Sequence, residues 1–512
     1  MTKRIISFVI CLAIFVTTIA VGAVIGNKAN SANVELPTNA PNDGSDIENM
    51  SVTTVGGEGS LLTYDKTIGE YILTGDVTVT KANEATNATY QALVSVFENT
   101  AYATDAKILD AKGHTITTEI SLFDKIGNCT IKNLNVVGTS ITIDKNDFVT
   151  VMDNNKAFGV IASYAHRHVI FENVNVDVDL SYSGNSSTTQ ISIGAFVGYA
   201  GVYRMENCKN DGNVTVTPSS CGTLSVGGFF GYKDEACGIL MENCINNGNI
   251  TAIKSGGRIG DCYAGGLSGC SYGVYDIINS SLNTGNVIAV QDTHNAARVG
   301  GFVGHCFAVV PTDCINLGDV SFTSTTTTYD GSIGKYRVGG IVGNGHYNTP
   351  FIRCINAGDI TLTAANSDKS TAGGLSPWRQ SGTSTFIDCV NLGDVQVIEG
   401  NSNTLKVGSG ITPHNDMRYT IFVNCYTVKT THEFNQFINQ MPDTVNGVSG
   451  SASDRYYITV PASVETYLEK VKTEQINDAK TVIKTILEMV EYDNRYAHNK
   501  DDGMSFKSTV IG

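Results

Sequence analysis

The sequence predicts an all-β fold, a right-handed parallel β-helix (β-solenoid) with a short C-terminal α-helical segment. Three observations carry this prediction. A glycine-rich phrase recurs along much of the chain, and a column of cysteines follows it at a nearly constant interval. The apolar residues between these landmarks form short β-type segments bounded by Gly and Asn, with no helical spacing before the last part of the chain.

The repeated unit has two parts. One copy reads Val-Gly-Gly-Ile-Val-Gly at 338–343 and, after a short loop, Ile-Arg-Cys-Ile-Asn-Ala-Gly-Asp-Ile at 352–360. Alignment of the second part across the copies places one column of residues at Cys208, Cys244, Ser281, Cys314, Cys354, Cys389 and Cys425, with spacings of 36, 37, 33, 40, 35 and 36 residues. A recurrence of about 20 to 50 residues indicates stacked repeats.

A parallel β-helix explains why such repeats must stack. Several short strands in one repeat cannot close a core alone, so each strand pairs with its counterpart in the repeats before and after it. Equivalent residues then lie about 4.8 Å apart in neighbouring rungs, which is the ordinary spacing between strands. Parallel crossover connections are right-handed by default, which sets the expected hand.

Two further columns follow the cysteines. Since all members of the first are asparagines, we expect a stack whose amides bond one another or the neighbouring backbone; they are Asn246, Asn283, Asn316, Asn356 and Asn391. The glycines two positions later are expected to adopt positive φ, which glycine tolerates best; they are Gly248, Gly285, Gly318, Gly358 and Gly393.

The repeats resemble a known family. The phrase Gly-Gly-Phe-Val-Gly at 300–304, with the upstream segments 113–117, 122–126 and 129–135, is similar to the GLUG-motif repeats of bacterial surface proteins, within the pectate-lyase-like right-handed β-helix group. The resemblance covers about residues 105–430. It implies the β-helix fold and an adhesin-like role, but no specific ligand. The phrase is altered near Ser376, Pro377 and Trp378 and again at 408–411, so the last rungs are expected to be less regular.

The first three segments precede the repeats. Residues 1–32 hold two basic residues and then a long apolar run, which predicts a signal peptide or an uncleaved membrane anchor. Residues 33–55, rich in Asn, Pro, Asp and Ser, are expected to be a linker. Residues 56–125 predict an N-terminal cap and the first β-helix rungs, with a short helix at 89–98.

The last two segments are the repeats and the C-terminal region. Residues 126–430 form the GLUG-like repeat β-helix, whose long loops at 181–189 and 323–336 are expected to project from one face as a binding surface. Residues 431–512 form a C-terminal region with an amphipathic helix, or a pair of helices, predicted from the apolar spacing between Val464 and Val490. We expect it to pack over the C-terminal end of the solenoid.

Composition argues against one class of partner. The 34 Lys and Arg against 49 Asp and Glu leave a formal charge of −15. Phosphate binding requires clustered basic residues, so no nucleic-acid partner is expected. Together with the N-terminal segment, the acidic balance favours an extracellular or cell-surface location reached by an export signal, with membrane contact only through that segment.

The 13 cysteines suggest disulfides in an exported chain. The column members recur at one interior position, however, which favours a reduced apolar stack and leaves at least one bridge within the column as the alternative. Better disulfide candidates lie next to the glycine phrase: Cys221, Cys237, Cys262, Cys270 and Cys306.

One column of acids is a candidate metal site. Asp319, Asp359 and Asp394 occupy equivalent positions in consecutive repeats. Carboxylates about 5 Å apart repel one another, and a bridging Ca²⁺ would relieve that repulsion. The alternative, which we favour, is that each is a turn residue bonding its own backbone, so that no cofactor is needed.

Aromatic residues near the glycine phrase are the candidate ligand-binding residues. If exposed, they would form a stacking track for a polysaccharide; they are Tyr199, Tyr232, Tyr272, Tyr347 and Trp378. The alternative is ordinary packing at the rim of the solenoid. Histidines show no metal-ligand spacing.

The function predicted from these features is binding. We expect a secreted or cell-surface adhesin-like protein whose partner is an extracellular glycan or a host or neighbour-cell surface protein. The alternative is a carbohydrate-active β-helix enzyme, a polysaccharide lyase or glycoside hydrolase. Such an enzyme needs acids that converge on one groove, whereas the acids of this chain are scattered among turns, so no catalytic residues are assigned.

Overall fold

The computed structural model describes most of residues 51–498. Its contacts separate the chain into two compact units, residues 1–50 and 51–512, and only the second is described here. The residues that lack a description within it are 99–105, 152–153, 186–188, 234–237, 257–259, 274–275, 294, 326–335, 346–348, 365–369, 378–383, 400–406, 413–419, 424, 429–443, 446–447, 450–456, 459–461, 475–477 and 499–512. The expected signal or anchor segment, most of the expected linker and much of both long loops lie outside the described residues.

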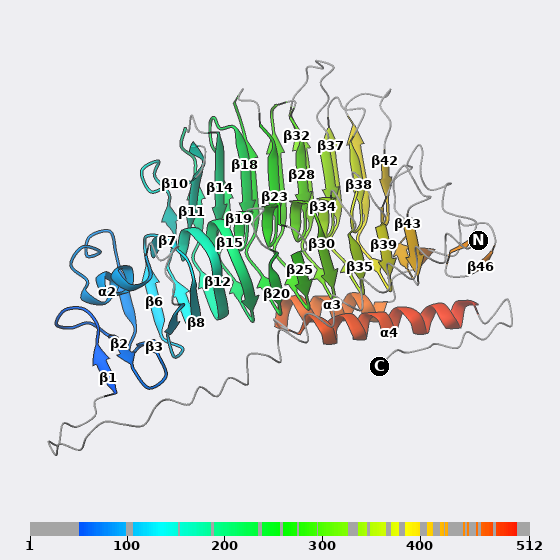
Figure 1. The fold of residues 1–512 in the computed structure, drawn as a ribbon. Coiled ribbons are helices and arrows are strands. Elements are labelled where there is room, and N and C mark those ends of the chain that lie inside the picture. The colour runs from blue at the N-terminus through cyan, green and yellow to red at the C-terminus, as the bar shows by residue number, and fades with distance from the viewer. Residues whose placement is uncertain are drawn as a thin grey trace, which may run out of the picture. The chain divides into compact units, whose positions relative to one another are not determined.

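Parallel strands stacked rung upon rung form the body of the molecule and confirm the β-solenoid (Figure 1). Each repeat visits three sheets in turn. One is a nine-stranded sheet of β10 Val149–Thr150, β11 Lys156–Gly159, β14 Gln190–Gly194, β18 Thr223–Gly227, β23 Cys262–Gly265, β28 Ala297–Gly300, β33 Tyr336–Gly339, β38 Thr371–Gly373 and β42 Val407–Ser409. Another is an eight-stranded sheet of β9 Ile141–Thr142, β13 Leu180–Tyr182, β17 Val214–Val216, β22 Ile250–Lys254, β27 Val287–Gln291, β32 Val320–Ser324, β37 Ile360–Ala364 and β41 Val395–Glu399.

The largest sheet connects the other two within each rung. Its repeat strands are β7 Phe123–Ile126, β8 Cys129–Val137, β12 Ala162–Asp177, β15 Val197–Glu206, β16 Lys209–Asn210, β19 Phe230–Lys233, β20 Leu240–Glu242, β21 Ile245–Asn246, β24 Ser268–Ser271, β25 Asp276–Asn279, β26 Leu282–Asn283, β29 Val303–Cys306, β30 Val309–Thr312, β31 Ile315–Asn316, β34 Val342–Gly345, β35 Pro350–Ile352, β36 Ile355–Asn356, β39 Ser384–Ile387, β40 Val390–Asn391, β43 Thr420–Val423, β44 Tyr426–Val428 and β47 Tyr457–Ile458. A separate antiparallel pair joins β45 Thr444–Val445 to β46 Val448–Ser449.

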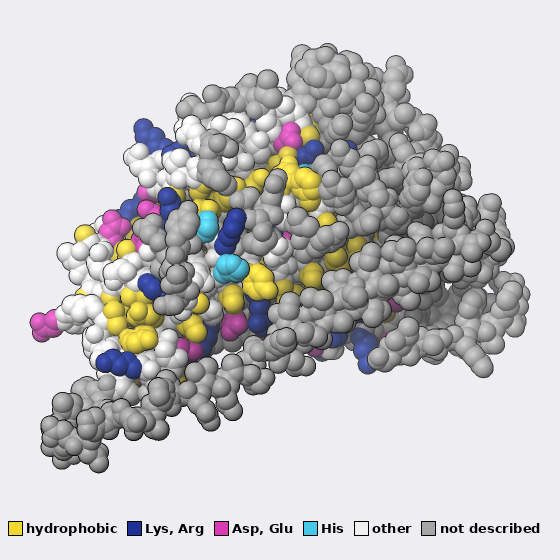
Figure 2. Space-filling view, in the orientation of Figure 1, with side chains coloured by type: hydrophobic (Ala, Val, Ile, Leu, Met, Phe, Trp, Pro, Cys, Tyr) yellow, Lys and Arg dark blue, Asp and Glu magenta, His cyan; other side chains and the backbone are white. Residues whose placement is uncertain are grey.

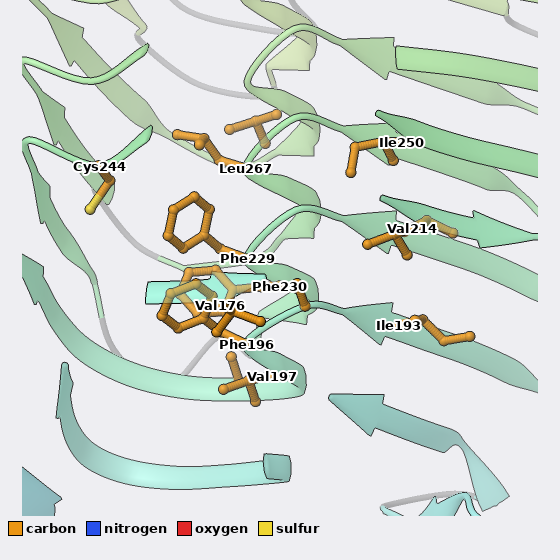
Figure 3. Packing of buried hydrophobic residues seen from close by; sticks show 14 of the residues in the cluster. Val176, Ile193, Phe196, Val197, Val214, Phe229, Phe230, Cys244, Ile250 and Leu267 are labelled. Atoms are coloured by element: carbon orange, nitrogen blue, oxygen red, sulfur yellow. The ribbon is translucent and has the colours of Figure 1, made fainter. Parts of the chain in front are cut away.

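The register between rungs aligns equivalent residues of successive repeats. In the rung of residues 297–324, β28 pairs with β33, β29 with β34 and β32 with β37, all in parallel. Inward side chains of the three sheets fill the interior. Figure 3 shows Phe196, Phe229 and Leu267 inside the rungs, and the rings of the two phenylalanines stack at 4.7 Å. Each is the apolar residue that follows the paired glycines or their equivalent, so the repeated phrase supplies a continuous core.

Close contacts explain the three glycines of the phrase. A Cβ on Gly300 would lie 2.2 Å from the carbonyl oxygen of Val303, and one on Gly304 would lie 2.5 Å from that of Gly269. A Cβ on Gly301 would meet the side chain of Asn316 as well as the backbone of Gly340, at 2.1 Å. The chain therefore turns sharply between the nine-stranded and the largest sheet, and the space needed for any side chain is already filled by backbone or by the asparagine column.

The asparagine column forms the predicted stack. Each amide nitrogen donates to the next asparagine oxygen at 2.7–2.8 Å along the series Asn210, Asn246, Asn283, Asn316, Asn356 and Asn391. The same nitrogen also donates to the backbone oxygen two residues later, as from Asn316 to Gly318 at 2.8 Å. All six side chains are fully buried. Water cannot reach them, so these hydrogen bonds take the place of those that water would otherwise make with the amides.

The expectation of positive φ at the later glycines is wrong. None of Gly248, Gly285, Gly318, Gly358 and Gly393 has a positive φ. These positions require glycine because the neighbouring backbone is too close for a side chain. A Cβ on Gly318, for example, would lie 2.0 Å from the carbonyl oxygen of Gly285. The left-handed residues stand instead directly before the cysteine column, with φ of 49–53°, at Asn207, Asn243, Ser280, Asp313, Arg353 and Asp388. Asn, Asp and Ser tolerate this conformation better than bulky residues do.

Antiparallel strands and one helix precede the first rungs. β1 Val52–Thr54, β2 Leu62–Asp65 and β3 Glu70–Leu73 pair antiparallel, while β4 Val77–Val79, β5 Lys107–Asp110 and β6 Thr115–Thr118 begin the parallel stacking. The predicted short helix is α2 Ala88–Phe97, and the Asn87 side chain accepts a hydrogen bond from the Tyr90 backbone N–H at its start. Leu93 and Phe97 of α2 join the main core.

The predicted C-terminal helices are α3 Ala462–Glu474 and α4 Ala479–His498. The helices were expected to pack over the C-terminal end of the solenoid, and their observed position is different. Val464, Val482, Ile483 and other apolar residues of the helices cluster with Ile245, Leu282, Ile315, Ile355 and Val390, the residues that follow the cysteine column in successive rungs. The helix pair therefore packs along a side of several rungs. No helix among the described residues is long and apolar enough to cross a membrane.

Candidate functional site

The two positions that flank the glycine phrase meet at the corner between the nine-stranded and the largest sheet. Before the phrase, the register aligns Ser225, Tyr263, Arg298, Arg337 and Thr371. After it, the register aligns Tyr199, Tyr232, Cys270, His305 and Asn344. Ring and hydrogen-bond contacts cross the corner between these columns. We call the resulting set the corner strip: Asp261, Tyr263, Arg298, His305, Arg337 and Asn344, with Tyr232 and Tyr272.

A charged group and an aromatic ring occupy the middle of the corner strip. Arg298 Nη1 donates to Asp261 Oδ2 at 3.1 Å and to the Tyr263 hydroxyl oxygen at 2.7 Å. The Tyr263 hydroxyl in turn donates to Asp261 Oδ2 at 2.5 Å. The guanidinium carbon also lies 5.2 Å from the centre of the Tyr263 ring, in reach of a cation–π interaction. These contacts fix the direction in which the guanidinium of Arg298 is presented.

A second chain of contacts continues into the next rung. Arg337 Nη1 donates to Asn344 Oδ1, and Asn344 Nδ2 lies 2.9 Å from His305 Nδ1. The His305 ring stacks on Tyr263 at 5.3 Å and meets the edge of Tyr272 at 5.2 Å. His305 and Asn344 are fully buried, whereas about 30% of the Asp261 side chain is exposed. The strip is thus a rigid polar and aromatic network with one edge open to solvent.

Burial changes the acid–base properties of the strip. Burial raises the pKa of Tyr263 well above its ordinary value and raises the pKa of Tyr272 to about 12. The pKa of Arg337 falls to about 9, first because the guanidinium is buried and then because Arg298 repels its charge. For Arg298 burial also acts to lower the pKa, but Tyr263, Asp261, Cys270 and Tyr272 together raise it above its ordinary value. An anionic group placed beside the two arginines would relieve their mutual repulsion.

The predicted tyrosine track exists as a ladder of rings, but it is less exposed than expected. Tyr199 stacks on Tyr232 at 5.0 Å, Tyr232 lies 5.7 Å from Tyr272, and Tyr272 lies 4.8 Å from Phe307. The expectation that all these rings are exposed is wrong for Tyr199, which is only 4% exposed. Tyr232 and Tyr272 are half-buried and keep an accessible edge.

Two predicted members of the track, Tyr347 and Trp378, lie outside the described residues. Six residues of the strip were not among the predicted ligand-binding residues: Asp261, Tyr263, Arg298, His305, Arg337 and Asn344. Their places beside the glycine phrase could have identified four of them. Arg298 and Arg337 directly precede Val-Gly-Gly, and His305 and Asn344 directly follow the closing glycine. Only the fold shows that both positions face one corner.

The aspartate column has the geometry of a turn. Asp319 Oδ1 accepts from the backbone N–H of Asp359 at 2.9 Å, and Asp359 Oδ1 accepts from that of Asp394 at 2.8 Å. Asn249 and Asn286 act in the same way in earlier rungs. The expectation that each aspartate bonds its own backbone is therefore wrong for Asp319 and Asp359, which bond the next rung, whereas Asp394 Oδ1 accepts from the adjacent Val395 N–H at 2.9 Å. No group of three or more His, Cys, Asp or Glu in the described part of the chain could hold a metal ion. The geometry gives the calcium site no support.

The cysteines of the described residues are all free thiols, and all are buried. The bridges expected for Cys221, Cys262, Cys270 and Cys306 are therefore not formed in this structure, and Cys237 lies outside the described residues. In the column, each thiol donates to backbone carbonyls, as from Cys354 Sγ to Pro311 at 3.4 Å. Burial raises the pKa of the Cys208, Cys354 and Cys389 thiols well above the ordinary value.

A surface cavity of about 480 Å³ lies near the start of α4. Its lining is mostly polar and comes from several rungs and from the residue before the helix: Asn175, Asn207, Cys208, Lys209, Asn243, Ile245 and Asp478. The two charges that line it have partners nearby, since Lys209 pairs with Asp211 at 2.9 Å and Asp478 accepts from the backbone N–H groups of Lys480 and Thr481. The corner strip is the better candidate site because its side chains converge.

The surface seen in Figure 2 mixes hydrophobic, acidic, basic and histidine side chains over its coloured part, without a continuous basic area. Comparison of the chain with protein-family models, with curated proteins and with solved structures finds no match.

Proposed function

We propose that the protein is a secreted or cell-surface adhesin-like β-solenoid that binds an extracellular glycan or a host or neighbour-cell surface protein. The corner strip is the observation that carries the proposal. It aligns half-buried tyrosine rings with a guanidinium held by Asp261 and Tyr263, along an edge that repeats from rung to rung. A glycan is the ligand class that this arrangement suits best.

The chemistry of sugars matches the strip in two respects. The C–H faces of a sugar ring pack on aromatic rings such as Tyr232 and Tyr272, and its hydroxyl groups need fixed donors and acceptors. Arg298 provides a hydrogen-bond donor and Asp261 an acceptor, and both are already oriented by their contacts with Tyr263. Because equivalent positions recur about every 4.8 Å along the solenoid, an extended chain of sugars could contact several rungs at once.

Export and surface location rest on the sequence alone. The apolar N-terminal run and the acidic balance support them. Expression of the full chain with and without residues 1–32, followed by fractionation of cells and medium, tests this part independently of binding. Retention of the full chain in the cytoplasm would contradict it.

Binding is tested with a glycan array and intact bacterial and animal cells, using the purified chain without residues 1–32. We expect Arg298→Ala and Tyr272→Ala to weaken binding at least tenfold, because each removes a contact that the strip presents. Tyr203→Ala is the matched control, since Tyr203 is 47% exposed in the largest sheet and its ring contacts His168 rather than the strip. Equal binding by all four proteins would reject the strip as the site, and no binding to any surface would reject the adhesin-like role.

The enzymatic alternative is tested with the same proteins. A lyase or hydrolase would release reducing ends from a panel of polysaccharides, and Arg298→Ala would slow that release. Binding without release supports the adhesin-like proposal, whereas release that depends on the strip would replace it.

A further inference from the structure

The cysteine column is divided into two runs of even length. Cys208 and Cys244 form the first run, and Cys314, Cys354, Cys389 and Cys425 form the second; Ser281 lies between them. In the rung before the first run, the position equivalent to Cys208 is occupied by Val174. Each run can therefore be paired completely between neighbouring rungs, with no thiol left over.

The register makes the members of each run direct neighbours. Lys209 pairs with Ile245, Ile315 with Ile355, Ile355 with Val390, and Val390 with Tyr426, and a cysteine stands immediately before each of these residues. Adjacent parallel strands lie about 4.8 Å apart. That separation falls within the range of about 4.4–6.8 Å between Cα atoms that a disulfide spans.

The thiols of a run also share one environment inside the solenoid. In the second run, Cys314 donates to the backbone oxygen of Ile278 at 3.2 Å and Cys354 donates to that of Pro311 at 3.4 Å. In the first run, Cys208 donates in the same way to Phe171 at 3.5 Å and Cys244 to Met205 at 3.7 Å. All six side chains point into the core and are at most 1% exposed. The two thiols of neighbouring rungs therefore lie in the same buried column, at positions that the register places side by side.

We propose that these thiols are oxidised in pairs to three disulfides between adjacent rungs: Cys208–Cys244, Cys314–Cys354 and Cys389–Cys425. In each pair two S–H bonds break and one S–S bond forms, and the two electrons and two protons reduce a small-molecule disulfide, such as oxidised glutathione, to two thiols. The second run pairs in this order because a Cys354–Cys389 bond would leave Cys314 and Cys425 unpaired, and these two residues are three rungs apart.

Oxidation takes place before the rungs close. In the folded chain the thiols are buried and donate to backbone carbonyls. Burial also raises the pKa of Cys208, Cys354 and Cys389, which suppresses the thiolate that attacks a disulfide. The bonds therefore form while the column is still accessible, and the completed core then shields them from reductants. An exported chain meets an oxidising environment at that stage.

The test compares the same full-length chain exported to a bacterial periplasm and retained in a reducing cytosol. Each sample is unfolded in an alkylating agent that traps free thiols, and disulfide-linked peptides are mapped by mass spectrometry. We expect the exported chain to have lost two hydrogens per bond and to give the three proposed linked peptide pairs. Fully alkylated cysteines in the exported chain would overturn the proposal, and so would bonds confined to other pairs or a Cys354–Cys389 bond.

A matched pair of variants adds a second readout. Cys244→Ser is expected to leave Cys208 alkylated and the other two bonds intact, and to lower the midpoint of thermal unfolding of the exported chain toward that of the cytosolic one. Cys129→Ser is the control, because Cys129 is equally buried but has Lys107 and Val169 as its rung neighbours. If Cys208 stays protected from alkylation in Cys244→Ser, or becomes alkylated in Cys129→Ser as well, the assignment of Cys208 to Cys244 is wrong.

Discussion

Lys233 and Asp276 form an ion pair inside the solenoid, with Nζ 2.9 Å from Oδ1 and side chains that are 1% and 4% exposed. The aspartate also accepts from the Ser271 hydroxyl and from the backbone N–H of Ile239 at 3.1 Å. These hydrogen bonds compensate for the loss of water around the carboxylate. The pair joins two strands of the largest sheet across neighbouring rungs, so it should matter for stability.

Removal of one member of this pair should be costly. We expect Asp276→Ala to lower the free energy of unfolding by about 3–5 kcal/mol, because a buried ammonium loses its counter-charge. Denaturant unfolding measures the change. Lys81→Ala is the control, since Lys81 and Asp147 form an ion pair with side chains 54% and 28% exposed, and we expect a change below about 1 kcal/mol. A loss of similar size in both variants would show that burial does not set the effect.

The asparagine stack should be sensitive to a single substitution. Asn316→Ala removes hydrogen bonds to Gly318 and Asn356, and it leaves one of the two amide N–H groups of Asn283 without an acceptor. Unsatisfied buried polar groups cost about 1–3 kcal/mol each, so we expect a loss of at least about 2 kcal/mol. Asn175→Ala is the control, because its amide bonds Asn135 at the exposed surface. A stability of Asn316→Ala equal to that of the control would contradict the role given to the stack.

The glycine phrase makes a steric prediction. Gly301→Ala would place a Cβ 2.1 Å from the backbone oxygen of Gly340 and 2.5 Å from Asn316 Cγ. The rungs would have to separate locally. Overpacking of this kind lowers the free energy of unfolding by about 1–3 kcal/mol or more. Gly57→Ala is the matched control, because no atom lies within 4 Å of its added Cβ and its φ is not positive. Thermal unfolding of both variants provides the measurement, and tolerance of alanine at residue 301 would show that the corner can relax.

Tyrosine ionisation predicts how stability depends on alkaline pH. Burial raises the pKa of Tyr90 and Tyr272 to about 12, against about 10 in an unfolded chain. Between these values the unfolded chain releases the protons first, so the stabilising contribution is complete below about pH 10 and is lost as the pH rises toward 12. We expect Tyr272→Phe to flatten the fall in stability above pH 10. Ultraviolet titration of the folded protein should show late ionisation, and an ordinary midpoint near 10 for all tyrosines would contradict this.

Sequence periodicity was enough to predict the solenoid and the asparagine stack. Both depend on which residues recur, and recurrence is visible in the chain itself. The role of Gly318 and its equivalents was misassigned because φ and close backbone approach both favour glycine, and sequence alone does not separate them. The true left-handed position, seen at Asn207 and Arg353, is occupied by several residue types and so leaves a weak pattern.

The candidate site was predicted only in part because it is formed across a corner. Tyr232 and Tyr272 were identifiable from their place after the glycine phrase, but their contacts with Tyr263 and His305 depend on how sharply two sheets meet. The burial of Tyr199 has the same origin. The helix pair was predicted from its spacing, whereas its docking place was not, since the apolar residue after each cysteine could equally have faced the core.

The row of buried amides has a direction. Every nitrogen from Asn210 to Asn391 donates toward the C-terminal neighbour, and the last one reaches the Thr427 hydroxyl at 3.3 Å. At the other end Asn210 Oδ1 is buried and accepts no hydrogen bond from the described residues, and its neighbour in the preceding rung is Val176, which has no side-chain donor. A duplicated repeat inserted within the row would keep each donor matched to an acceptor. Evolution could thus lengthen or shorten this molecule by whole turns in its middle, while both ends of the row stay as they are.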